Sequence, residues 1–173
     1  MIKIVLTASP NPFSWAIRKI TKARVSHTMG QFDGILPFKR PWVFEAMSKG
    51  TRLVPARRVR HNIVVEYECL VDLKPALLKV IEKRTGDGYD TPQLFSIAFY
   101  ILCWKLFKRR IKVGARSMHS QICSEIWAEV FIEAKLIETS TWDIEYTSPK
   151  RIDRYCGRHP ELFREIPREG SDV

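Results

Sequence analysis

Cys123 opens the segment whose residue types are best suited to covalent chemistry. Ile126, Trp127 and Val130 follow it at helical spacing and share one apolar face. Ser120 is predicted to cap this helix, which places Cys123 in the first turn. There the helix dipole favours a thiolate, and free backbone N–H groups can bind an oxyanion. The pattern predicts either a nucleophile or a small apolar residue on a buried helix face.

A nucleophilic cysteine needs a base, and two predicted strands supply one together with a partner. His27 alternates with Val25 and Met29, so it is expected on an apolar strand face. Glu45 is expected on an apolar face of its own strand for the same reason. Because burying either group alone is costly, we expect His27 and Glu45 to satisfy one another. Such a pair fixes the imidazole tautomer and leaves the second ring nitrogen for a thiol.

The elements that must position these residues are predicted as strands in the first half and mainly helices in the second. Strands are expected over residues 2–7, 25–32, 43–47, 52–54 and 63–71, with a hairpin loop over 48–51. Helices are expected over 12–21, 75–84, 94–107 and 122–136, and Thr147-Ser148-Pro149 predicts the start of another. This order predicts an α+β fold, an antiparallel sheet packed against helices, in a single domain over residues 1–173.

The order of the motifs resembles the circularly permuted NlpC/P60 papain-like proteins, in which the His-bearing strands precede the Cys-bearing helix. The similar motifs are Ser26-His27, Phe44-Glu45-Ala46, Gly88-Tyr89-Asp90 and Cys123-Ser124-Glu125. The resemblance implies a permuted papain-like fold with Cys123 as nucleophile, His27 as base and Glu45 as the orienting residue. It also implies that Tyr89 lines the cleft or donates a hydrogen bond to an oxyanion, whereas its surroundings alone indicate only a turn.

These residues predict a cysteine hydrolase or acyltransferase that cleaves an amide or ester through a thioacyl intermediate, with no metal or organic cofactor. The resemblance implies a peptidase or amidase acting on peptides of the cell-wall type. Two alternatives stay open. One is a lipid-directed acyl hydrolase, and the other is a non-catalytic basic module that binds nucleic acid or a membrane.

Charge predicts the kind of partner without choosing one. The chain has 29 Lys and Arg against 19 Asp and Glu, a net charge of +10, and 45% hydrophobic residues, which excludes wholesale disorder. The excess favours anionic partners such as nucleic acid, a membrane surface or a cell-wall polymer, and the predicted chemistry adds a peptide or acyl substrate. The basic runs 57–61 and 108–112 lack an aromatic RNA-binding pattern and a helix-turn-helix, so nucleic acid is disfavoured. The oligomeric state is left open.

Other pairings of cysteine and histidine are weaker. His119 precedes Cys123 by four residues and Cys156 precedes His159 by three, and neither spacing is usual for zinc, so no metal site is predicted. His119 is disfavoured as the base because two residues on one helical turn leave no groove for a substrate. A chain with this much core needs no disulfides, so the four cysteines are expected to be free thiols.

Location is predicted from two segments. The N-terminal apolar run is shorter than that of a signal peptide and is read as a strand. Residues 94–107 would form a helix of roughly 21 Å, short of a hydrocarbon core of about 30 Å. We therefore expect a cytoplasmic protein, with peripheral membrane association left open by the basic residues that follow this segment.

Overall fold

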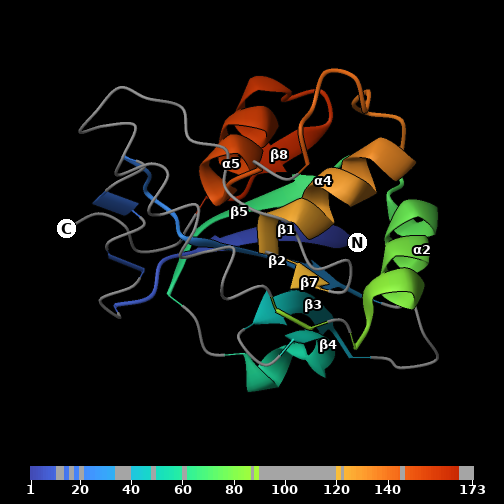
Figure 1. The fold of residues 1–173 in the computed structure, drawn as a ribbon. Coiled ribbons are helices and arrows are strands. Elements are labelled where there is room, and N and C mark those ends of the chain that lie inside the picture. Colours follow the sequence, from blue (N-terminus) through green and yellow to red (C-terminus); the bar gives the residue numbers. More distant parts are fainter. Residues whose placement is uncertain are drawn as a thin grey trace.

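The fold is built on one antiparallel sheet (Figure 1). The computed structural model describes residues 1–10, 14–15, 18–19, 22–33, 40–47, 50–59, 62–86, 88–89, 120–121, 123–144 and 147–167. The sheet has six strands in the order β4-β3-β2-β1-β5-β8. The strands are β1 (Ile2–Thr7), β2 (His27–Phe32), β3 (Trp42–Met47), β4 (Gly50–Pro55), β5 (Ile63–Cys69) and β8 (Phe163–Glu165). Every neighbouring pair is antiparallel.

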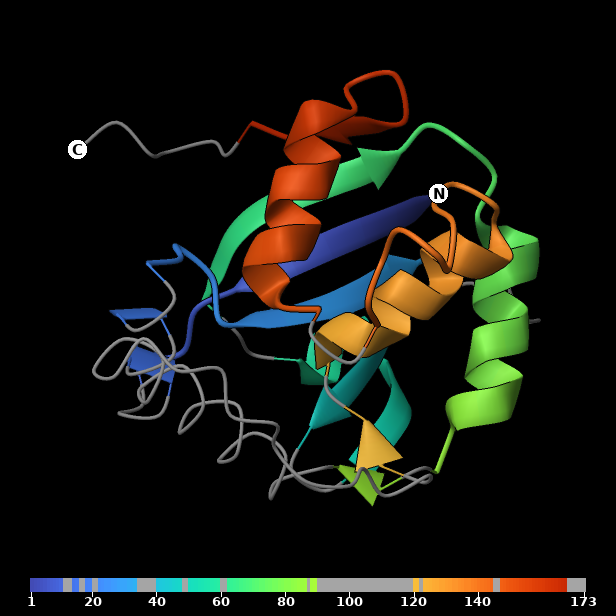
Figure 2. The same ribbon diagram turned by 45° about the horizontal axis from the view of Figure 1, so that its top comes forward.

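Helices α2 (Lys74–Arg84), α4 (Cys123–Glu133) and α5 (Pro149–Arg158) gather on one face of this sheet, and Figure 2 shows α4 and α5 in front of the strands. A 3-10 turn, η1 (Ala56–Arg58), follows β4. Two short strands, β6 (Gly88–Tyr89) and β7 (Ser120–Gln121), pair in parallel with each other. The arrangement confirms the predicted α+β class with an antiparallel sheet packed against helices. None of the described helices is long and apolar enough to cross a membrane.

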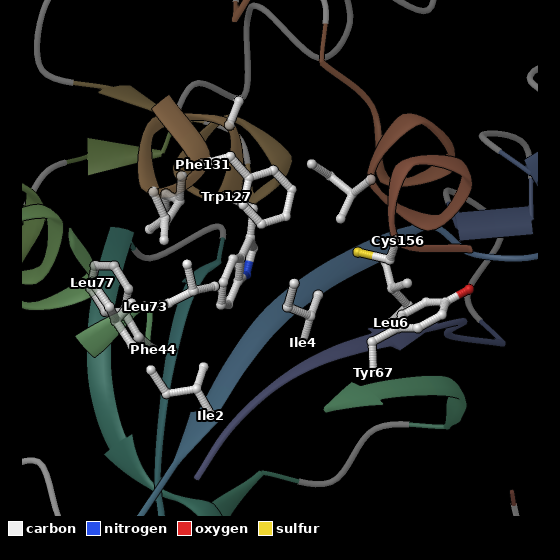
Figure 3. Close-up of a cluster of buried hydrophobic side chains, with 14 of the residues drawn as sticks. Ile2, Ile4, Leu6, Phe44, Tyr67, Leu73, Leu77, Trp127, Phe131 and Cys156 are labelled. Carbon is white, nitrogen blue, oxygen red and sulfur yellow. The ribbon is translucent and has the colours of Figure 1, made fainter. Parts of the chain in front are cut away.

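The main core lies between α4 and the sheet (Figure 3). Trp127 and Phe131 of α4 are at most 1% exposed and pack with strand residues such as Ile4 and Phe44. Leu77 of α2 belongs to the same cluster, as does Cys156 of α5. A smaller cluster of Val5, Met29 and Val43 forms from the alternate positions of the same strands, which alternation directs to the other face of the sheet.

Two local signals place the elements next to the site. Gly50 has a φ of 107°, which favours glycine, and it pairs with Met47 at the end of the β3–β4 hairpin. Ser148 caps α5, where its side chain accepts a hydrogen bond from the Arg151 N–H, and Pro149 occupies the first turn. Both the hairpin and this helix start were predicted from the sequence and are confirmed.

Most predicted strands are found with small shifts of their ends. The prediction over 2–7 matches β1, whereas β2 begins two residues later than the predicted strand over 25–32, and β5 ends two residues before residue 71. Residues 14–15 and 18–19 are helical, and the rest of the predicted helix over 12–21 lies mainly outside the described residues. The predicted helix over 94–107 and the basic run 108–112 lie wholly outside them.

Three features of the fold differ from expectation. Ser120 is not the cap of the cysteine helix, because its backbone is extended and pairs with Gly88 in the β6–β7 ladder. Glu125, Glu129 and Glu133 recur at every fourth residue, a spacing that predicts a polar helix face. Glu125 is nevertheless fully buried, because α4 is covered by the sheet on one side and by α2 and α5 on others. Strand β8 was missed. It is only three residues long and exists because it pairs with β5.

Candidate active site

Cys123 is the first residue of α4 and is 4% exposed. The position of Cys123 depends on the close approach of α4 to β2. A Cβ built on Gly30 would lie 2.5 Å from Cζ2 of the buried Trp127, one helical turn beyond Cys123. The missing side chain at Gly30 therefore lets the helix rest directly on the strand. The predicted place of the cysteine at a helix start is confirmed, although Ser120 does not cap it.

His27 and Glu45 lie on adjacent strands and meet. His27 Nε2 is 3.6 Å from Glu45 Oε2, an ion-pair distance. Strands β2 and β3 are paired from Phe32↔Trp42 to Gly30↔Phe44, and His27 and Glu45 lie beyond the last of these pairs. We infer that the end of this ladder is what brings His27 within reach of the first turn of α4.

Arg52, which the sequence reasoning did not single out, holds the carboxylate of Glu45. Its Nε and Nη2 donate to Oε1 at 3.0 and 2.7 Å, so Oε2 is the oxygen that faces His27. Arg52 is opposite Glu45 in the β3–β4 register. The predicted loop over 48–51 would pair position 45 with 54, whereas the observed strands are joined by residues 48–49 and pair Glu45 with Arg52, so the predicted register missed this contact. A buried carboxylate is stabilised in its charged form by such a bond.

His27 also interacts with Cys123, and this interaction raises the pKa of His27. Burial lowers the pKa of His27, but the charge of Cys123 and a side-chain hydrogen bond with it raise the pKa, as do the hydrogen bond and charge of Glu45. Together they place the pKa of His27 at about 9, above its usual 6.5. An imidazolium is therefore the form of His27 that exists at neutral pH, held between two groups that carry negative charge when ionised.

The three predicted residues thus converge from β2, β3 and the start of α4. The side chain of His27 is 14% exposed, whereas that of Glu45 is buried completely. Geometry and burial assign them different positions in the site. The side chains make contact in the order Cys123, His27, Glu45 and Arg52.

The first turn of α4 is also tied to the loop before α5. Ser124 Oγ donates to the Thr147 carbonyl at 2.7 Å, and both residues are buried. Thr147 Oγ1 in turn accepts a hydrogen bond of 2.6 Å from Trp142 Nε1. No sequence signal singled out this network, because it joins residues 23 positions apart. These hydrogen bonds tie the first turn of α4 to the loop before α5.

The remaining sequence predictions for the site have different outcomes. The Tyr89 backbone pairs with Gln121 two residues before Cys123, but its side chain lies outside the described part, so its role stays a prediction. His119 also lies outside the described residues.

Cys69, Cys123 and Cys156 are free thiols, as expected. His159 Nδ1 lies 2.8 Å from Glu161 Oε1, and Cys156 is buried within α5. Among described residues, no group of three or more His, Cys, Asp and Glu side chains is placed to hold a metal.

We expect Gly30→Ala to destabilise the protein by about 1–3 kcal/mol, as overpacking of a well-filled core does. The added methyl group meets Trp127, which is 1% exposed and has no open space to move into. Gly157→Ala in α5 is the matched control. Its Cβ would approach only the Tyr67 hydroxyl at 3.5 Å, so it should stabilise by about 0.5–1 kcal/mol through helix propensity. Urea unfolding of both variants measures the difference, and equal effects would contradict the close approach of α4.

Comparisons with known proteins give a shared fold and no family. No family model matches the chain, and no curated protein matches its sequence. Among solved structures, the chain is similar to a protein described as metalloprotein yiiX from Escherichia coli O157:H7, DUF1105. The two are 19% identical over 96% of each chain, with a TM-score of 0.57. This likeness shows a common fold.

The expected membership of the permuted NlpC/P60 family is therefore wrong. No family model supports it, and the solved structure that shares the fold is a DUF1105 protein. The short motifs that carried the resemblance, such as Ser26-His27 and Cys123-Ser124-Glu125, are two or three residues long. They follow from the needs of a paired histidine and a helix-start cysteine, and they do not identify a family.

Proposed function

We propose that the protein is a cysteine hydrolase or acyltransferase that cleaves an amide or ester through a thioacyl intermediate. The observation that carries the proposal is the interaction of Cys123 with His27, whose other side meets Glu45. A nucleophile beside a base that a third group orients is the arrangement needed for covalent acyl transfer. A papain-like arrangement, with the histidine strand preceding the cysteine helix in the chain, belongs to the same proposal.

The reaction follows from the positions of the three groups. The thiolate of Cys123 attacks a carbonyl carbon and forms a C–S bond, while the first N–H groups of α4 hold the negative oxygen. His27, as an imidazolium, gives its proton to the leaving nitrogen or oxygen as that bond breaks. Water, or another acceptor hydroxyl or amine, then loses a proton to His27 and attacks the thioester. The C–S bond breaks, and the acid or new acyl product leaves with the thiolate restored.

One solved structure that shares this fold is described as a metalloprotein, which raises the question of a metal site in this chain. The described residues do not fit one. Glu45 already accepts two hydrogen bonds from the Arg52 guanidinium, whose positive charge opposes a cation at the same carboxylate. We therefore route no step of the proposed reaction through a metal. The proposed substrate is an amide or ester, and the cell-wall peptides that the family implied receive no support from the comparisons.

The experiment that tests the proposal is selective alkylation of the folded protein. We expect iodoacetamide at neutral pH to modify Cys123 at least about tenfold faster than Cys69 or Cys156, since only a thiolate reacts. Burial, with a smaller contribution from the charge of Glu68, raises the pKa of Cys69 to about 12. Burial likewise raises the pKa of Cys156 well above its ordinary value. Mass spectrometry of the three cysteine peptides over time gives each rate.

His27→Ala is the matched control for this labelling, because it removes the partner of Cys123 and leaves all four cysteines of the chain in place. The rate at Cys123 should fall, while the rates at Cys69 and Cys156 should not change. Equal rates at all three thiols, or a Cys123 rate that is independent of His27, would contradict the proposed function.

A further inference from the structure

We propose that a groove along α5 binds a phosphate-bearing ligand, at a site separate from Cys123. The groove has a volume of about 420 Å³. Its walls carry four cationic side chains, Lys150, Arg151, Arg154 and Arg158, above the aromatic rings of Trp142 and Tyr155. Cys123, His27 and Glu45 do not line it. This inference goes beyond the proposed reaction and does not depend on it.

Helical spacing brings these cations together on one side of α5. Lys150, Arg154 and Arg158 follow one another at intervals of four residues, so they form a single stripe along the helix. Arg151 and Tyr155 form a second stripe beside it. Like charges four residues apart oppose each other by about 0.2–0.5 kcal/mol per pair. A bound anion would remove this repulsion.

The carboxylates near α5 are committed elsewhere. Asp153, the acidic residue of the helix, accepts hydrogen bonds from Arg24 at 2.9 and 2.7 Å and from the Tyr67 hydroxyl at 2.8 Å. Glu161 pairs with His159 at the far end of the groove. Arg154 and Arg158 are exposed, and within the described ranges no carboxylate forms an ion pair with either of them. The charges of Arg154 and Arg158 therefore have no carboxylate partner among the described residues, while Lys150 donates a hydrogen bond to the Lys22 carbonyl at 2.9 Å.

The chemistry of the lining favours phosphate over other anions. Arginine forks donate parallel hydrogen bonds to phosphate oxygens, and three arginines converge here. The aromatic floor is ordered, because Trp142 and Tyr155 meet edge to face with centroids 5.2 Å apart and Arg151 lies 4.2 Å above the Trp142 ring. These contacts hold the Arg151 guanidinium in place at the wall of the groove. Both a soluble phosphate ester and a lipid headgroup have this shared chemistry.

Calorimetric titration with two probes tests the proposal at physiological ionic strength. The soluble probe is glycerol 3-phosphate, and the surface probe is a phosphatidylcholine vesicle with and without phosphatidic acid. We expect saturable binding of at least one probe, with affinity lowered about 100-fold in Arg154→Glu/Arg158→Glu, since each lost charged contact is worth roughly 1.5 kcal/mol or more. Both arginines are exposed, so circular dichroism should show an unchanged fold.

Arg57→Glu/Arg58→Glu is the matched control, because it makes the same change of net charge at two exposed arginines of η1. This variant should bind within about twofold of the wild type, and Cys123→Ala should bind normally. Loss of glycerol 3-phosphate binding in the α5 variant alone identifies a soluble ligand, and loss of vesicle binding alone identifies a headgroup. Equal weakening by the two charge-reversal variants would overturn the proposal, as would binding of neither probe.

Discussion

Cys123→Ala should abolish turnover of p-nitrophenyl butyrate, with a loss of about 10⁵-fold or more, as removal of a nucleophile does in other covalent hydrolases. The wild type should release a burst of p-nitrophenol equal to the amount of protein, because acylation of Cys123 precedes hydrolysis of the thioester. The Cys123 peptide should gain one butyryl group during the burst. The alanine variant should show neither the burst nor the adduct.

Cys123→Ser and Cys156→Ala are the controls for this result. Serine keeps the shape of the cysteine at the helix start, so a lost burst in that variant reports lost chemistry and not a changed fold. Cys156 is equally buried but lies in α5, and its replacement should leave the burst intact. A full burst in Cys123→Ala, or a butyryl group found on another residue, would contradict Cys123 as the nucleophile.

His27→Ala should lower the rate by about 10³–10⁴-fold, in the range of general acid–base catalysis. The variant removes both the positive partner of the thiolate and the proton donor of the leaving group. Glu45→Gln should cost less, about 10–100-fold, because the amide keeps the volume of Glu45 and still accepts a hydrogen bond from the ring. Glu45 acts through His27 and is a positioning residue. His119→Ala should leave the rate close to that of the wild type.

The pH dependence of the same variants separates positioning from a purely structural effect. The rate of the wild type should fall as the pH rises through about 9, where His27 loses its proton. Glu45 raises the pKa of His27, so the fall in rate should move to lower pH in Glu45→Gln.

The pKa of His27 in the folded protein lies above 6.5. The stability that His27 contributes is therefore fully present below pH 6.5 and is lost as the pH rises through 9. If His119→Ala is the inactive variant and His27→Ala is active, the assignment of the base is wrong.

The parts of the site that the sequence predicted are those with local signals. Alternation along each strand predicted that His27 and Glu45 are buried, although it grouped them with Met29 and Val43, on the sheet face away from α4. Helical spacing after Cys123 predicted the helix that this residue begins. Both patterns record burial within a few residues, so they survive the small shifts at the ends of β2 and α4. The meeting of the three residues was a hypothesis about tertiary structure, and the contacts of His27 agree with it.

The parts that were missed depend on contacts between distant segments. Ser120 has the side chain of a good helix cap, yet pairing with Gly88 holds it in a strand. Glu125 fits the polar spacing of an exposed face, but α4 is a central helix with neighbours on several sides. Arg52 was missed because the loop between β3 and β4 is two residues shorter than predicted, and this shorter loop places Arg52 opposite Glu45. Strand β8 is too short to carry a pattern of its own.

The parallel pairing of β6 with β7 has a consequence for how such a chain can diversify. Residues 90–119 leave the described structure at Tyr89 and return at Ser120, and the pairing of Gly88 with Ser120 holds those two points side by side. Because the ends are already joined, the entropy of closing the intervening segment changes only slowly with its length. Insertions and deletions there can therefore leave Cys123 and the sheet in register.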